Sequence, residues 1–456
     1  MLKRLGALVF VAVLSFLSGG WLLHREPTAD GNLYEQARIL ETVLSVIHDH
    51  ALVAPPQGEL FQNAARNLVS QLKDPYAELL VGDGYRQFNR QMSGTGEVLP
   101  TAPRAPGEDA PVHVPAISPS LLLTPTVGYA ALHSLSEGAA DELAAAVWNL
   151  RKQGMRSLVL DLRNNPGGLI REGVRVSQLF LNKGDTVATT RGRTSAHTKT
   201  YVADAAQRWP GLNVVVLVND GTASSAELIA GALQDHDRAA VIGQPTYGKG
   251  VLQTTYPLGN EMAIKLTTAR WFTPSGRSVN RPRTASDSAA EQQRLGALSR
   301  GVQFRTDGGR PLAEANGIVP DLLVKRDSYT AGERRFLDSL GNNYGVFRKA
   351  LEETAAKVKA EGTITQENFA VTAAMREAVR AALATRGVRL QPATFDGAAT
   401  YVDRQLSYEI ARAVFGDAAA NRRRLLDDRQ LRMALDLVQQ APTQPDLIRY
   451  AEQATE

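Results

Sequence analysis

Apolar and polar positions along residues 127–275 follow two alternating periods. Short runs that are almost entirely apolar, such as SLVLDL (157–162) and LNVVVLV (212–218), predict strands buried on both faces. Segments with helical spacing, such as AELIAGALQD (226–235), lie between such runs. Strands that alternate with helices predict a layered α/β core, here residues 127–328, so the expected fold class is mixed α/β.

The regions on either side of this core have other patterns. Residues 29–99 and 329–456 carry apolar residues at helical spacing, which predicts an N-terminal helical region and a C-terminal helical domain. Residues 100–126 are rich in proline and predict a linker or an irregular covering strand rather than a domain. One C-terminal stripe is expected to be a packing face rather than a cofactor site: Val402, Leu406, Ile410 and Val414.

Residues 1–28 predict a membrane anchor. Lys3 and Arg4 precede an apolar stretch from Leu5 to Leu23, close to the ~20 residues that a helix needs to cross a bilayer. The basic end is expected to stay in the cytoplasm, which places the rest of the chain outside it, in the periplasm. The alternative is a cleaved signal peptide, which leaves a secreted or periplasmic protein.

Composition excludes several function classes. The formal net charge is only +4, with no concentrated basic stripe, so nucleic acid is not an expected partner. The chain has no cysteine, which excludes disulfides, thiolate nucleophiles and cysteine-bound metals.

Three loops follow predicted strands and carry the candidate chemistry: RNNPGG (163–168), NDGTASS (219–225) and QPTYGKG (244–250). In open α/β sheets, active groups gather in the loops at the carboxyl ends of strands. Ser224 lies where a strand turns into a helix, and the helix N-terminus there favours developing negative charge. This placement suits a nucleophile that attacks a carbonyl carbon. The alternative is a serine that only caps the helix.

A serine nucleophile needs a base, and no histidine lies in the three loops. Lys249 is the remaining candidate, provided that desolvation removes its proton. Strand alternation places Lys249, Val251 and Gln253 on one side, so the amide oxygen of Gln253 can hold the amine. A plain turn lysine is the other possibility.

The stretch GQPTYGKG (243–250) also resembles a phosphate-binding P-loop. Gly250, however, stands where that motif requires Ser or Thr. A P-loop also runs into a helix, whereas the VLQTTYPL that follows here has a strand pattern. The sequence therefore argues against a nucleotide site.

The glycine pair in the first loop supplies a third part of the site. Gly167 or Gly168, together with the backbone N–H of Ser225, can form an oxyanion hole. The sequence leaves open which of the two glycines contributes.

Taken together, these segments closely resemble the carboxyl-terminal processing (tail-specific) serine protease family. The resemblance covers about residues 33 to 325. It rests on LKDPYAELL (72–80), LVLDLRNNPGGL (158–169), VLVNDGTASSAELIAGALQD (216–235), VIGQPTYGKGVLQT (241–254), RWFTPSGRSVN (270–280) and GIVPDLLV (317–324).

This resemblance implies a protease core of the ClpP/crotonase-like kind that uses neither metal nor cofactor. It places the family's nucleophile on Ser224, its general base on Lys249 and its lysine-orienting glutamine on Gln253. It also implies polypeptide substrates, cleaved near their C-termini through an acyl-enzyme.

One departure from the family concerns substrate recognition. Family members usually carry a PDZ domain between the helical region and the core, whereas here the interval is far shorter than the roughly 80 to 100 residues of a small domain. We infer that the PDZ domain is missing, which puts its recognition of C-terminal tails in doubt. The C-terminal helices are the candidates to replace it, through homo-oligomerisation or an adaptor partner.

The hypothesis from sequence is therefore an extracytoplasmic endopeptidase with a Ser–Lys dyad that cleaves unfolded or C-terminal segments of polypeptides. The alternative is a catalytically silent scaffold or binding protein that keeps the protease fold, since kinship of fold does not guarantee activity.

Overall fold

The chain divides into two compact units, Met1–Leu79 and Leu80–Glu456. The computed structural model describes residues 33–53, 55–96, 112–281, 304–313 and 316–454. The expected membrane anchor, residues 1–28, lies outside the described residues. Within the residues that are described, no helix is both long enough and apolar enough to span a bilayer.

The described residues of the first unit form helices α2 (Leu33–His50) and α3 (Gln57–Ser70), as the apolar spacing predicts. Strand β1 (Glu78–Val81) begins where this unit ends. The apolar face expected on α2 stays largely uncovered within its own unit, with Leu40 and Val43 both exposed.

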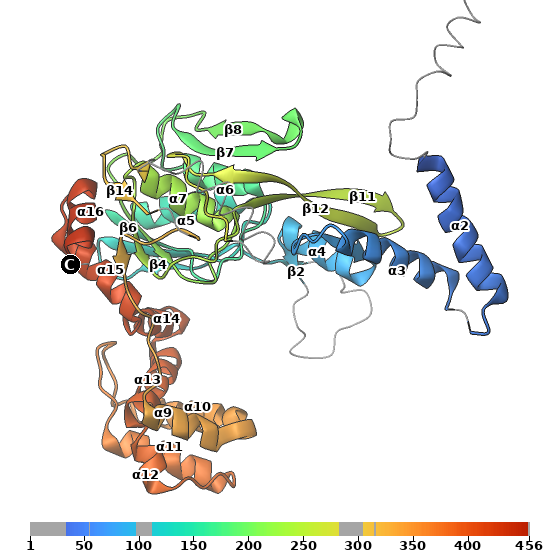
Figure 1. The fold of residues 1–456 in the computed structure, drawn as a ribbon. Coiled ribbons are helices and arrows are strands. Elements are labelled where there is room, and N and C mark those ends of the chain that lie inside the picture. Colours follow the sequence, from blue (N-terminus) through green and yellow to red (C-terminus); the bar gives the residue numbers. More distant parts are fainter. Residues whose placement is uncertain (1–32, 54, 97–111, 282–303, 314–315, 455–456) are drawn as a thin grey trace, which may run out of the picture. The chain divides into compact units, whose positions relative to one another are not determined.

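The core of the larger unit is a six-stranded sheet with the strand order β15-β10-β9-β6-β5-β4. Strands β4 and β6 of this sheet are labelled in Figure 1. Its strands are β4 (Ile117–Leu122), β5 (Val127–Leu132), β6 (Ser157–Asp161), β9 (Asn213–Val218), β10 (Ala240–Gly243) and β15 (Leu322–Leu323). Neighbours from β5 to β15 run parallel, and β4 pairs with β5 antiparallel. Because β6, β9 and β10 are parallel, their carboxyl ends meet at one edge, where the three predicted loops begin.

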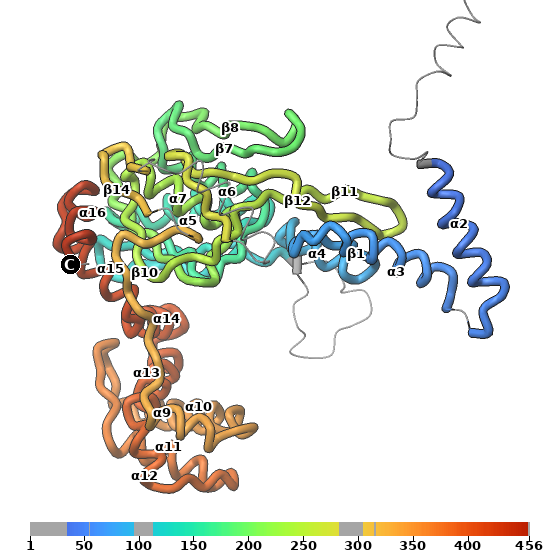
Figure 2. The backbone as a smooth tube through the Cα atoms, in the orientation of Figure 1, coloured from blue at the N-terminus to red at the C-terminus, as the bar shows by residue number. Residues whose placement is uncertain are grey.

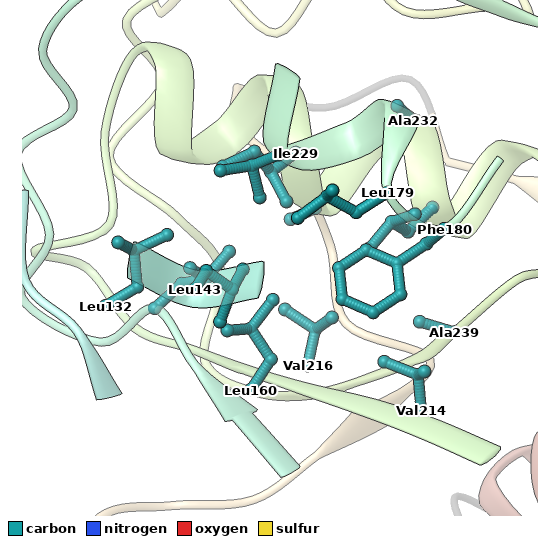
Figure 3. Close-up of a cluster of buried hydrophobic side chains, with 14 of the residues drawn as sticks. Leu132, Leu143, Leu160, Leu179, Phe180, Val214, Val216, Ile229, Ala232 and Ala239 are labelled. Atoms are coloured by element: carbon teal, nitrogen blue, oxygen red, sulfur yellow. The ribbon is translucent and has the colours of Figure 1, made fainter. Parts of the chain in front are cut away.

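Helices α5 (Ala139–Lys152), α6 (Ile170–Gln178) and α7 (Ser225–Asp235) pack on one face of this sheet. Figure 3 shows part of the resulting core, in which Leu160 of β6 and Val216 of β9 lie near Ile229 of α7. The intervening strand residues, such as Val159, face the other side, because side chains alternate along a strand. Two C-terminal helices cover that side: α15 (Arg429–Gln440) and α16 (Gln444–Gln453).

A second sheet contains a long hairpin, which Figure 2 shows as a continuous path of the backbone. Strand β11 (Val251–Gly259) pairs antiparallel with β12 (Met262–Phe272) along nearly its whole length. The end of β12 pairs with β7 (Thr186–Gly192), which in turn pairs with β8 (Lys199–Val202). A short 3-10 helix, η1 (Ser195–His197), joins the last two strands.

A short ladder joins the chain just before the proline-rich interval to a strand within it. Helix α4 (Asp83–Ser93) leads to β2 (Thr95–Gly96), which pairs antiparallel with β3 (Val112–His113). The chain therefore returns close to its starting point after residues 97–111, which lie outside the description. Further on, residues 117–122 form β4, so for this part of the interval the covering-strand alternative applies.

The C-terminal region is helical, as predicted. Its helices before α15 are α9 (Ala331–Leu340), η2 (Gly341–Asn343), α10 (Tyr344–Glu361), α11 (Ala373–Thr385), α12 (Pro392–Asp396), α13 (Ala399–Phe415) and α14 (Asp417–Leu426). Helices α9 to α13 share a core in which Phe336 packs edge-on against Phe347 and Phe395. Val402, Leu406 and Ile410 are buried in this core, which confirms that the predicted stripe is a packing face.

The mixed α/β class, with a helical region on either side of the core, is confirmed, while the five residue ranges given for the regions of the chain stay predictions. A two-stranded ribbon completes the described elements: β13 (Phe304–Arg305) and β14 (Pro311–Leu312).

The central sheet should dominate stability. Leu160→Ala empties a fully buried position in β6, and such truncations lower the free energy of unfolding by about 2–5 kcal/mol. Leu258→Ala removes the same atoms from a residue that is 54% exposed. It should change the free energy of unfolding by less than about 0.5 kcal/mol. Urea unfolding of both variants would measure this difference, and equal effects would contradict the assigned core.

Candidate active site

All the residues predicted for the site line one cavity of about 640 Å³. They are Gly167, Gly168, Ser224, Ser225, Lys249 and Gln253. Apolar side chains supply much of the remaining wall: Phe88, Met92, Leu169, Ile170, Leu228, Val251, Leu252 and Trp271. The three loops that sequence pattern singled out therefore meet in space.

Ser224 joins β9 to α7 and stands at the N-cap position of the helix. Its backbone has φ 56° and ψ −122°, a region that residues other than glycine rarely occupy. Such a conformation costs of order 1–3 kcal/mol and persists only where the surroundings impose it, often at functional sites. A hydrogen bond next to Ser224 helps to hold this conformation, since Ala223 donates its N–H to the carbonyl of Asn165 at 2.9 Å.

Lys249 precedes β11 by two residues, and its amine donates to Oε1 of Gln253 at 2.7 Å. This is the contact that strand alternation predicts. The carbonyl of Lys249 accepts from the indole N–H of Trp271 at 3.1 Å, which fixes the backbone at the base of the side chain. The strand that follows also confirms the argument against a P-loop, because no helix begins at this loop.

Packing explains the two glycines that flank Lys249. A Cβ atom at Gly250 would lie 2.7 Å from the backbone nitrogen of Asn280, closer than such atoms approach. Gly248 has φ 85°, and its Cβ would lie 2.8 Å from Cβ of Arg281. Gly250 therefore stands in this motif because the neighbouring backbone leaves no room for a side chain.

Sequence reasoning missed Glu227, which is fully buried beneath the site. Its Oε2 accepts the backbone N–H of Ser224 at 2.8 Å and that of Lys249 at 2.8 Å. Its Oε1 accepts the N–H of Gly248 at 2.7 Å and the hydroxyl of Thr246 at 2.5 Å. One carboxylate thus joins the two loops that carry the candidate nucleophile and base. The spacing Ser224-x-x-Glu227, a capping-box pattern, is the signal that would have pointed to it.

The electrostatics of Glu227 reflect its position. Burial raises the pKa of the Glu227 carboxyl above its ordinary value, while the hydrogen bonds that it accepts act in the opposite direction. Its hydrogen-bond partners among the described residues are backbone N–H groups and a hydroxyl, with no cationic side chain.

The two glycines of the first loop differ in how their N–H groups are used. Gly167 donates its N–H to Oδ1 of Asn165 at 2.8 Å. No described residue accepts the N–H of Gly168, whose carbonyl accepts the hydroxyl of Ser225 at 3.2 Å. Gly167 instead provides space, because a Cβ there would lie 2.9 Å from Cβ of Ser224.

Two alternatives to a lysine base are a histidine base and a bound metal ion. Across the described ranges, no histidine lines the cavity. The same part of the chain contains no group of three or more His, Asp or Glu side chains placed to hold a metal ion.

Comparison with known proteins finds relatives in one class of enzyme. Residues 126–290 match Peptidase family S41. A probable CtpA-like serine protease from Staphylococcus haemolyticus is 23% identical over 79% of this chain and 84% of its own length. The carboxy-terminal-processing protease of Bartonella bacilliformis is 40% identical over 36% of this chain, a region that spans 39% of that relative.

Among solved structures, the photosystem II D1 C-terminal processing protease matches 34% of this chain and 39% of its own, with 37% identity and a TM-score of 0.31. The family match and the relatives in sequence define a serine-type peptidase. Over residues 126–290, the chain is therefore similar to peptidase family S41.

If Glu227 holds the two loops together, then Glu227→Gln should disable the site. An amide offers one acceptor oxygen to donors that now use two, so at least one buried N–H loses its partner, at about 1–3 kcal/mol. We expect peptidase activity per folded molecule to fall at least about tenfold, the result of about 1.4 kcal/mol in the barrier.

A matched control is Asp321→Asn. Asp321 is also a buried carboxyl that accepts a backbone N–H, from Val241 at 2.7 Å, but it does not line the cavity. This variant should lose stability and keep its activity. Equal activities in the two folded variants would contradict a specific role for Glu227.

Proposed function

We propose that this protein is an extracytoplasmic serine endopeptidase with a Ser224–Lys249 dyad, which cleaves unfolded or C-terminal segments of polypeptides. The observation that carries the proposal is the geometry around Glu227. Its Oε2 binds the backbone of both dyad residues, and Gln253 holds the amine of Lys249 in the same cavity.

In the proposed reaction, Oγ of Ser224 attacks the peptide carbonyl carbon while the neutral amine of Lys249 takes the hydroxyl proton. The C–N bond then breaks, and the Lys249 ammonium returns the proton to the leaving amine. The same amine then takes a proton from water, which attacks the ester carbonyl of the acyl-enzyme. The bond between that carbon and Oγ of Ser224 breaks, the Lys249 ammonium returns the proton to Oγ, and the second product leaves as a carboxylic acid. Apolar lining from Val251 and Trp271 supports the neutral amine, since low polarity disfavours the charged form.

The tetrahedral intermediates carry a negative oxygen, which the proposal assigns to the backbone N–H groups of Gly168 and Ser225. The N–H of Gly168 is favoured over that of Gly167, because Gly167 already donates to Asn165. Ser225 begins α7, so its N–H is among those without a partner inside the helix.

Substrates should be extended polypeptides. Among the described strands β11 pairs only with β12, and its residues 251–255 line the cavity. An unpaired strand edge can accept an extended peptide as a further strand, which a folded substrate cannot offer. The apolar wall around Phe88 and Ile170 suits apolar side chains next to the cleaved bond.

We further propose that residues 1–28 hold the enzyme at a membrane with its catalytic region outside the cytoplasm. The support is Lys3 and Arg4 followed by the apolar stretch of residues 5–23. If that segment is cleaved, the enzyme is periplasmic or secreted.

Cleavage of an unstructured protein such as casein tests the dyad. Ser224→Ala and Lys249→Arg should each lower the rate by about 10³-fold or more, because one removes the nucleophile and the other keeps a permanent charge. The readout is the initial rate of peptide release.

Ser339→Ala and Lys183→Arg are the matched controls, at exposed positions outside the cavity, and should match the parent. Persistent cleavage in both dyad variants would rule out the assignment. A parent that does not cleave would favour the alternative of a silent scaffold with a protease fold.

A further inference from the structure

Arg163 anchors the loop of residues 163–168, which carries Gly168. The Arg163 side chain is only 14% exposed. It binds the Asp161 carboxylate through Nε and Nη2, at 2.9 and 2.6 Å. Its Nη1 then donates to Oδ2 of Asp428 at 2.7 Å and to Oε1 of Gln430 at 2.9 Å.

Asp428 and Gln430 belong to the start of helix α15, more than 260 residues away along the chain. Asp428 caps this helix, since its Oδ1 accepts the N–H of Leu431 at 2.9 Å. Gln430 is 2% exposed and donates from Nε2 to the carbonyl of Val324 at 2.7 Å. The two acceptors are therefore held by a helix end, and α15 is itself packed on the central sheet.

The same loop is tied on its other side to the loop of the nucleophile. The N–H of Asn164 donates to Oδ1 of Asn219 at 2.9 Å, and Nδ2 of Asn219 donates back to Oδ1 of Asn164 at 2.9 Å. Asn219 also accepts the N–H of Gly221, three residues before Ser224. The Gly168 loop thus lies between the nucleophile loop and the C-terminal helix.

We propose that Asp428 and Gln430 are positioning residues, through which helix α15 and Arg163 hold the loop that stabilises the oxyanion. This inference rests on the proposed function, because it assigns part of that function's geometry to the C-terminal helical region. Loss of the two acceptors leaves Arg163 paired with Asp161, so the fold survives while the loop loses its contact with helix α15. Small displacements of catalytic groups, about 1 Å, can lower rates as much as 10²-fold.

The test uses the full chain with Asp428→Asn, Gln430→Met and the double variant. Asparagine keeps the helix cap and removes the charge, so α15 should still form. We expect the double variant to lower kcat about tenfold with KM nearly unchanged, because the oxyanion exists only after attack. A merely structural role would lower the unfolding midpoint and leave kcat per folded molecule unaltered.

Two controls share the region without touching Arg163. Asp427→Asn alters the adjacent residue, which accepts the hydroxyl of Tyr408 at 2.8 Å. Glu452→Gln breaks an ion pair between α16 and Arg310 at 3.2 Å. Both controls should keep the parental kcat.

A second readout does not depend on turnover. Amide hydrogen exchange of a peptide covering residues 163–170 should be faster in the double variant than in the parent and both controls. Unchanged exchange in that peptide, or a parental kcat in the double variant, would overturn the inference. If the parent itself fails to cleave, the proposed function fails, while the exchange measurement still decides whether α15 holds the loop.

Discussion

The geometry of the candidate active site depends on one buried carboxylate, that of Glu227. Glu227 accepts backbone N–H groups from the loop of Ser224 and from the loop of Lys249, which are separate connections at the edge of the central sheet. Burying a charge without partners is strongly unfavourable, so Glu227 is stable here only when both loops supply their donors. The same requirement fixes the backbone nitrogens of the candidate nucleophile and base near one shared oxygen.

The parallel sheet makes this possible. Its strands deliver three loops to a single edge, and helix α7 places Glu227 one turn below Ser224. Glycines then let the loops approach closely, with Gly167 against Ser224 and Gly250 against Asn280. The C-terminal helix α15 covers the opposite face of the sheet and reaches the Gly168 loop through Arg163. The site is thus framed by elements that lie far apart in the chain.

The pattern of apolar and polar residues along the chain was enough to predict part of the fold and of the site. The strand after Lys249 placed Gln253 correctly, because side-chain alternation is a property of a few consecutive residues. Glu227 was missed, because its helical position looks the same whether it caps a helix or joins two loops. The Arg163–Asp428 pair and the difference between Gly167 and Gly168 depend on tertiary contacts, which no local period encodes. Part of the proline-rich interval proved to be strand β4, whose pairing with β5 decides its structure.

The central claim is that Ser224 is a nucleophile activated by Lys249. Covalent labelling with a fluorophosphonate, followed by mass spectrometry of the digested protein, tests it most directly. The account predicts a phosphonyl adduct on Ser224 in the parent, and little or none in folded Lys249→Ala. An adduct on a different serine, or equal labelling of Ser224 without Lys249, would contradict it.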